Sequence, residues 1–272
     1  PSPFFDEVAN PAPRPSLWIP TRGVVAGGRV FTSDGRALRV FDAASGRLEL
    51  SPFPLTPGAD PNSAPDMAGR PSRRRFGWIE GHGLTVDGDR VYVTRAAEIV
   101  RRGAELDADG AVLASLAVDG ARDRVLGLTL VGRAFVRRFE VGGGIATPGL
   151  PSGMRLFGTP LLYRGALHLA GLRPTPATTD RVEAWHVALD PVTGAVRSAT
   201  FLGAGGPVRR GRDDEAVPAS CAGARGRVVL VTSLGIAAAV DADTGRTAWT
   251  LRYDRGRPDG DDLTHRLDGP VE

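Results

Sequence analysis

The side chains best suited to metal or acid–base chemistry in this chain are four histidines. They stand at His82, His168, His186 and His265. A zinc or copper site needs three or four convergent ligands, and the only close acid–histidine pair before an expected strand is Glu80-Gly81-His82. His168 and His186 each lie in an alternating apolar segment, so the two could meet on paired strands. Such a pair suits either a metal or a structural contact, and structural histidines are the commoner case.

Candidate nucleophiles do not form a catalytic motif. Cys221 is the only cysteine, which excludes an internal disulfide and a multi-cysteine zinc site. No histidine is near it in sequence, and we interpret it as a small apolar residue. No Gly-x-Ser-x-Gly elbow occurs. The chain has no lysine, its 34 basic residues all being arginine, so Schiff-base and phosphate-loop lysines are excluded.

Acidic and aromatic residues give no stronger signal. The segments 213–215 and 259–262 are rich in aspartate but lack the spaced oxygen ligands of a calcium loop, and we interpret them as solvated loops. We expect Trp18, Trp78 and Trp185 to pack between sheets rather than to line a groove. The arginine clusters alternate with aspartates at a net charge of +3, whereas nucleic-acid binding needs a concentrated basic face. The sequence therefore predicts no catalytic, cofactor-binding or metal site and no nucleic-acid partner.

These residues are embedded in a pattern that occurs four times. Each copy has an apolar strand, a glycine turn, a second strand and then an aspartate followed by a glycine. The four aspartate–glycine signatures are Asp42 to Gly46, Asp107 to Gly110, Asp190 to Gly194 and Asp241 to Gly245. The aspartate accepts hydrogen bonds from backbone N–H groups of the turn, and the glycine adopts a conformation that other residues resist. The signature is therefore structural rather than catalytic.

The repeats predict an all-β fold built from small antiparallel sheets. The apolar segments are short and alternating, and 36 glycines and 22 prolines supply many turns. We expect four-stranded blades of a β-propeller at about 23–51, 83–117, 158–202 and 216–252. The signature aspartates are 65, 83 and 51 residues apart, against roughly 40–50 in a regular propeller. The longest gap has room for a fifth blade, which a hairpin at 123–141 would fill, and a part of a larger ring is the other alternative.

The expected domain organisation has three parts. Residues 1–21 are a proline-rich N-terminal arm, 22–252 form the propeller, and 253–272 are a polar C-terminal tail. Long loops at 52–75, 142–156, 172–180 and 203–215 are the expected partner contacts, since function on such scaffolds usually resides in loops. The longest apolar stretch, 228–240, is too short and too interrupted to span a membrane.

Two stretches, 25–46 and 240–249, resemble the repeats of the PQQ-like (quinoprotein-type) β-propeller family, and the resemblance extends over most of 22–252. The family includes quinoprotein alcohol dehydrogenases, an outer-membrane assembly lipoprotein and exported bacterial proteins. Its repeats place a tryptophan four residues after the glycine, which this chain keeps only at Trp249. The other positions hold Leu50, Ala114 and Ser198. The dehydrogenases also have adjacent cysteines at the cofactor, which one cysteine does not provide, so the resemblance implies the non-enzymatic, exported branch without a cofactor.

We therefore expect a non-enzymatic scaffold that mediates protein–protein interaction in an extracytoplasmic bacterial assembly, periplasmic or associated with the outer membrane. The partner would be another protein or the remainder of a larger polypeptide, because blades that do not close their own ring leave a β edge open to pairing. Two alternatives stay open. One is the propeller of a degenerate PQQ-dependent oxidoreductase, and the other is a ligand-sensing module of a membrane-associated protein.

Overall fold

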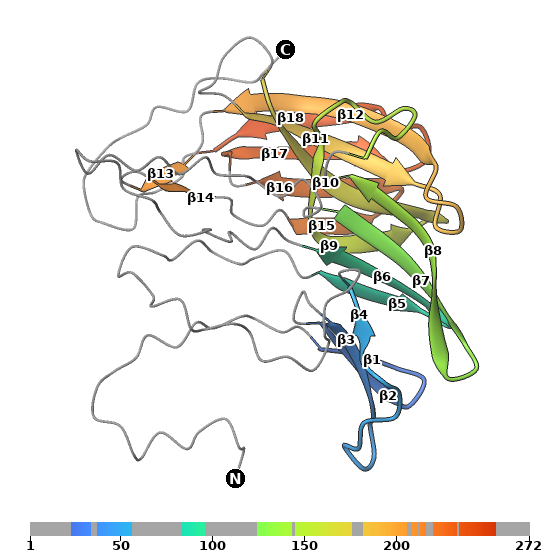
Figure 1. Ribbon diagram of the computed structural model, residues 1–272. Coiled ribbons are helices and arrows are strands. Elements are labelled where there is room, and N and C mark those ends of the chain that lie inside the picture. Colours follow the sequence, from blue (N-terminus) through green and yellow to red (C-terminus); the bar gives the residue numbers. More distant parts are fainter. Residues whose placement is uncertain are drawn as a thin grey trace, which may run out of the picture.

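The computed structural model describes residues 23–33, 37–55, 83–95, 124–142, 145–175, 182–205, 208–210, 213–215, 220–232 and 234–253. These residues form strands and turns, without a helix (Figure 1). The strands are β1 (Gly23–Ala26), β2 (Arg29–Ser33), β3 (Ala37–Asp42), β4 (Phe53–Pro54), β5 (Leu84–Asp87), β6 (Arg90–Arg95), β7 (Arg124–Val131), β8 (Ala134–Gly142), β9 (Arg155–Tyr163), β10 (Ala166–Pro174), β11 (Val182–Leu189), β12 (Val196–Gly205), β13 (Val208–Arg210), β14 (Asp213–Glu215), β15 (Ser220–Ala224), β16 (Arg227–Thr232), β17 (Ile236–Asp241) and β18 (Thr247–Arg252).

The strands form four antiparallel four-stranded sheets, each in simple chain order. Blade 1 is β1–β4, blade 2 is β5–β8, blade 3 is β9–β12 and blade 4 is β15–β18, and a two-stranded sheet pairs β13 with β14. Consecutive sheets of this kind, packed face to face, are the building units of a β-propeller. The predicted all-β propeller class is confirmed.

The prediction of a fifth blade at 123–141 is wrong. That hairpin is β7–β8, and β7 pairs with β6 along a continuous register from Arg90 opposite Thr129 to Arg95 opposite Arg124. The hairpin thus supplies the third and fourth strands of blade 2. The predicted end of this blade at 117 is wrong for the same reason, since β7 and β8 extend the blade to Gly142. The signature from Asp107 to Gly110 lies outside the described residues.

The three other signature turns have the predicted geometry and lie between the third and fourth strands of their blades. In each, the glycine N–H donates to the aspartate carbonyl at 2.9 Å. The aspartate Oδ1 accepts the N–H of the residue before the glycine, at 2.7 Å from Ser45, 2.9 Å from Thr193 and 2.8 Å from Thr244. The glycine φ angles are 68°, 73° and 72° at Gly46, Gly194 and Gly245, in the region that favours glycine.

Three apolar cores join the blades into a row. One core lies between blades 1 and 2, the next between blades 2 and 3, and the last between blades 3 and 4. The first strands also meet in succession, β1 against β5, β5 against β9, and β9 against β15. Figure 1 shows β1–β4 at the bottom of this row, with β9–β12 and β15–β18 overlapping in the upper half of the view. Among the described strands, blade 4 and blade 1 do not share packing of comparable extent.

Several other predictions fall partly or wholly outside the described residues. The predicted arm 1–21 lies outside them, as does the predicted tail 253–272 except Tyr253, whose N–H donates to Gly235 O at 2.8 Å. Of the expected loops, 172–174 belong to β10, 203–205 to β12, and Phe53–Pro54 to β4. The acidic segment 213–215 is strand β14 rather than a loop, because it pairs with β13. The second acidic segment, 259–262, lies outside the described residues.

Candidate functional site

The two histidines expected on paired strands lie on the neighbouring strands β10 and β11. His168 Nδ1 is 2.9 Å from His186 Nε2, and the two buried rings are stacked with their centroids 5.2 Å apart. His168 Nε2 lies 3.1 Å from the Tyr163 carbonyl, so we assign the proton of His168 to Nε2. His168 Nδ1 then accepts from His186 Nε2–H, and His186 Nδ1 is left without a hydrogen-bond partner.

Burial keeps this pair neutral. Desolvation, with the neighbouring His168 as a smaller cause, lowers the pKa of His186 to about 3. Desolvation likewise lowers the pKa of His168. Among the described residues, no three histidine, cysteine or carboxylate side chains come together, and two imidazoles do not complete a zinc or copper site. The geometry is that of a buried hydrogen-bonded pair. His82 and His265 lie outside the described residues.

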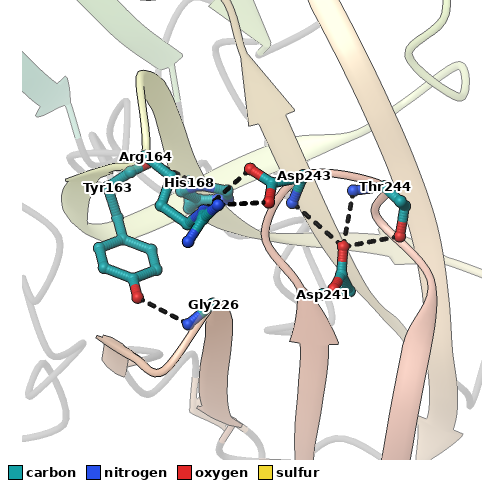
Figure 2. A network of polar contacts seen from close by, with 7 residues as sticks. All are labelled: Tyr163, Arg164, His168, Gly226, Asp241, Asp243 and Thr244. Carbon is teal, nitrogen blue, oxygen red and sulfur yellow. Dashed lines mark hydrogen bonds and ion pairs between the residues drawn. The ribbon is translucent and has the colours of Figure 1, made fainter.

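Polar contacts at one edge of the junction between blades 3 and 4 hold the two blades in register (Figure 2). Arg164, in the turn between β9 and β10, makes two bonds to Asp243, Nε to Oδ1 at 3.0 Å and Nη2 to Oδ2 at 2.9 Å. These bonds raise the pKa of Arg164. The Tyr163 hydroxyl accepts the N–H of Gly226 at 2.9 Å. A parallel bidentate arginine–carboxylate pair fixes geometry as well as charge, so blade 3 aligns the signature turn of blade 4.

The remaining sequence candidates in the described part take structural positions. Cys221 packs against the core between blades 3 and 4, and burial raises its pKa to about 12. Trp185 packs edge-on against Phe201 with ring centroids 5.5 Å apart, and its Nε1 donates to Glu183 at 2.9 Å. Neither residue is arranged for chemistry. Trp18 and Trp78 lie outside the described residues.

The junctions between blades 2 and 3 and between blades 3 and 4 each cover the signature glycine of the following blade. A Cβ added at Gly194 of blade 3 would lie 2.5 Å from Phe139 of blade 2. A Cβ added at Gly245 of blade 4 would lie 2.6 Å from Ser198 of blade 3, and Thr200 Oγ1 donates to the Gly245 carbonyl at 2.6 Å. Gly46 of blade 1 differs, since an added Cβ there would meet nothing within 4 Å. The signature turn of blade 1 is therefore not covered as those of blades 3 and 4 are.

The outer face of blade 4 is apolar and faces away from blade 3. Two cross-strand rows make up this surface, which we call the end face of blade 4. They are Ala222, Val229, Ala239 and Trp249, and beside them Val231, Ala237 and Leu251. The opposite side of the sheet, with Val228 and Val240, forms the core with blade 3. Val231 is 41% exposed, Trp249 42% and Leu251 53%, so the end face of blade 4 is an apolar surface in contact with solvent.

The outer face of blade 1 is apolar as well. Its cross-strand row, the end face of blade 1, consists of Val25, Val30, Phe41 and Leu48. The other side of this sheet, with Phe31 and Val40, packs on blade 2. Val25 is 71% exposed and Leu48 49%. Together the two end faces hold five of the nine exposed large hydrophobic side chains in the described residues. Such concentration, rather than scattered single residues, is typical of interaction surfaces.

The sequence did not predict the end faces. The alternation in β2 and in β18 is visible in the sequence and predicts strands of small antiparallel sheets. The same alternation occurs in strands whose apolar sides are fully covered, as in β6 and β10. Which blade stands at an end of the row depends on packing between blades, which no local pattern encodes.

Models of known protein families and the curated proteins gave no match to this chain. Solved structures do resemble it, and they include BamB from Moraxella catarrhalis, with 16% identity and a TM-score of 0.45 over 83% of this chain and 50% of that one. Sqt1 from Saccharomyces cerevisiae has 13% identity and a TM-score of 0.40 over 87% and 50%. A europium-containing methanol dehydrogenase has 9% identity and a TM-score of 0.39 over 86% and 50%.

These resemblances are low in identity and concern the fold alone. The chain spans about half the length of each of the three solved structures. The class that the fold defines is an all-β protein of propeller blades. In the part of the chain that the structure describes, no helix is long and apolar enough to cross a bilayer.

Proposed function

We propose that this chain is a non-enzymatic propeller module of the PQQ-like type that binds protein partners in an extracytoplasmic bacterial assembly or within a larger polypeptide. The observation that carries the proposal is the pair of apolar end faces. Side chains at the same places in the sheets are buried or partly buried where two blades meet, and at the ends of the row they are exposed to solvent. Covering them with another protein surface would remove that exposure, which is the main driving force of protein association.

The PQQ-like assignment is supported by the signature turns. Three copies share the aspartate acceptor, the hydroxyl residue before the glycine, and the left-handed glycine. The extracytoplasmic location comes from the family resemblance of these repeats. Separation of periplasmic, membrane and cytoplasmic fractions of the source cells tests it, and the chain in the cytoplasmic fraction would contradict it.

The residues present do not fit a catalytic quinone. The dehydrogenases of the resembled family have adjacent cysteines at the cofactor, and this chain has one cysteine. Cys221 packs into the core between blades 3 and 4, where burial raises its pKa to about 12 and keeps the thiol protonated. We therefore propose no reaction for this chain and assign its binding role to the surfaces of the blades.

Site-specific photo-crosslinking in the source cells tests the binding role. A photoreactive phenylalanine analogue replaces Leu251 in one variant and Leu48 in another, so that each end face carries one probe. The matched control carries it at Val131, which is 53% exposed, lies at the tip of the β7–β8 hairpin of blade 2, and belongs to neither end face. We expect cross-linked protein products from the two end-face positions and few from position 131. Equal or absent products at all three positions would overturn the proposal.

A further inference from the structure

Every blade has one side for the preceding blade and one for the following blade. The second residue of each second strand faces the preceding blade, and it is fully buried at Val91, Leu167 and Val228. The residues opposite them on the third strands, Leu128, Leu189 and Val240, are also buried. In blade 1 the corresponding pair, Val30 and Phe41, is only partly buried. Blade 1 is therefore built to receive a preceding blade.

Blade 4 is built to be followed by another blade. Ser198 of blade 3 stands opposite Ala188, two residues before the signature aspartate, and touches the signature glycine of blade 4. Trp249 occupies the same place in blade 4. It stands opposite Ala239, and Ala239 is two residues before the signature aspartate Asp241. In the described structure Trp249 is 42% exposed. It stands where a side chain covers the signature turn of a following blade.

The end face of blade 4 is complementary to the end face of blade 1, whereas neither end face is complementary to a second copy of itself. Blade 4 offers the side that fits a following blade, and blade 1 offers the side that fits a preceding blade. Among the three described signature glycines, Gly46 of blade 1 is the exposed one, while Gly194 and Gly245 are buried. A second copy of this chain brings both kinds of side. One type of interface, formed twice, then covers all four end faces.

We propose that two copies of the chain join head to tail, with blade 4 of each copy on blade 1 of the other, to close a ring of two times four blades. Head-to-tail contacts close into a ring when the rotation between copies permits and otherwise extend into filaments. The closed ring leaves no end face exposed, which is why we choose it over a chain of copies. The inference rests on the proposed function and names the partner as the chain itself.

The turn between the first two strands of a blade offers a position at which a new ion pair can be introduced into this interface. Arg164 in blade 3 and Arg225 in blade 4 occupy equivalent turn positions, with φ angles of 49° and 50°. Arg164 forms its ion pair with Asp243, two residues after the signature aspartate of the next blade. The same position in blade 1 is Ala44. In the proposed ring Arg225 thus faces Ala44 of the second copy, and Ala44→Asp would create the ion pair that blades 3 and 4 already have.

Native mass spectrometry and light scattering of the full chain, over a range of concentrations, test the inference. We expect a species of twice the 28.6 kDa chain mass. Leu251→Glu places a charge in the interface and should weaken association at least on the order of tenfold. Its control, Val131→Glu, adds the same charge to an equally exposed valine and should leave association unchanged. Both positions are exposed, so circular dichroism of the two variants should match that of the unmodified chain.

Ala44→Asp should tighten association roughly two- to fivefold, the range of an exposed ion pair, and Arg225→Ala in the same chain should cancel the gain. The ring of two copies would be overturned by a 28.6 kDa species at all concentrations or by a series of masses larger than two copies. It would also be overturned if Leu251→Glu left the association unchanged. The cross-linking separates the two proposals. Products that contain only a different polypeptide would contradict the inference and leave the binding role standing, whereas absent products would contradict the binding role as well.

Discussion

At the residue scale, the polar side chains that stand out in the sequence take structural positions within a blade. In the buried histidine pair, His186 donates a hydrogen bond to His168, and His168 donates one to the Tyr163 carbonyl. Alternation placed both residues on paired strands, which the sequence predicted. Their neutral state and the missing partner at His186 Nδ1 depend on how completely blade 4 covers them, and this could not be predicted from the sequence.

The pair makes stability sensitive to mild acid. Both pKa values are lowered in the folded chain, that of His186 to about 3, while the unfolded chain titrates near 6.5. Below that pH the unfolded chain binds more protons, so the free energy of unfolding falls on acidification. The loss is about 1.4 kcal/mol per pH unit for each histidine that charges only when unfolded. The stabilising contribution is complete above pH 6.5 and is lost toward the folded pKa.

Denaturant unfolding at pH 7, 6 and 5 measures this dependence. His186→Gln keeps an N–H donor for His168 Nδ1 but removes one titrating group, so its slope between pH 6 and 5 should be smaller by about one proton. A stability that is flat or rises from pH 7 to pH 5 in the unmodified chain would show that the pair is not kept neutral by burial.

At the element scale, the signature turn is the part of the fold that the sequence predicted best. Its hydrogen bonds join residues within five positions of one another, as between Asp241 and Arg246, so a local pattern is enough to identify it. Blade 2 was assigned incorrectly for the opposite reason. Its β6–β7 pairing joins residues on both sides of positions 96–123, and no local pattern predicts such a pairing.

The covered glycines predict how tightly the blades pack. Gly245→Ala should destabilise the chain more than Gly88→Ala, although both glycines have positive φ angles, of 72° and 57°. The backbone cost is similar at both, about 1–2 kcal/mol. At Gly245 the new methyl also meets Ser198 at 2.6 Å, while at Gly88 nothing lies within 4 Å. Overpacking adds about 1–3 kcal/mol.

Thermal or denaturant unfolding of the two variants gives this comparison directly. Adding Ser198→Gly to Gly245→Ala should restore part of the loss, because it removes the side chain that the methyl meets. Equal destabilisation by the two alanines would mean that blades 3 and 4 are not held in contact at this turn.

At the scale of the whole molecule, the row of blades has two ends, and both are apolar. The three junctions within the row bury equivalent side chains. Each end of the row therefore resembles one side of such a junction, with the opposite side to be supplied by another protein surface. The sequence predicted an unclosed ring with a protein partner, from the number of repeats. It did not predict the two end faces, because Val30 and Trp249 sit in the same local pattern as buried residues of other blades.

The most direct test of the central claim is the native mass of the assembly that contains this chain, purified gently from its own source. We expect a mass above the 28.6 kDa of the chain, with the excess made of polypeptide. We also expect the excess to be lost when Leu251→Glu replaces the unmodified chain in the source cells. A mass of 28.6 kDa alone would contradict the account, since the end faces would then be exposed in the working protein.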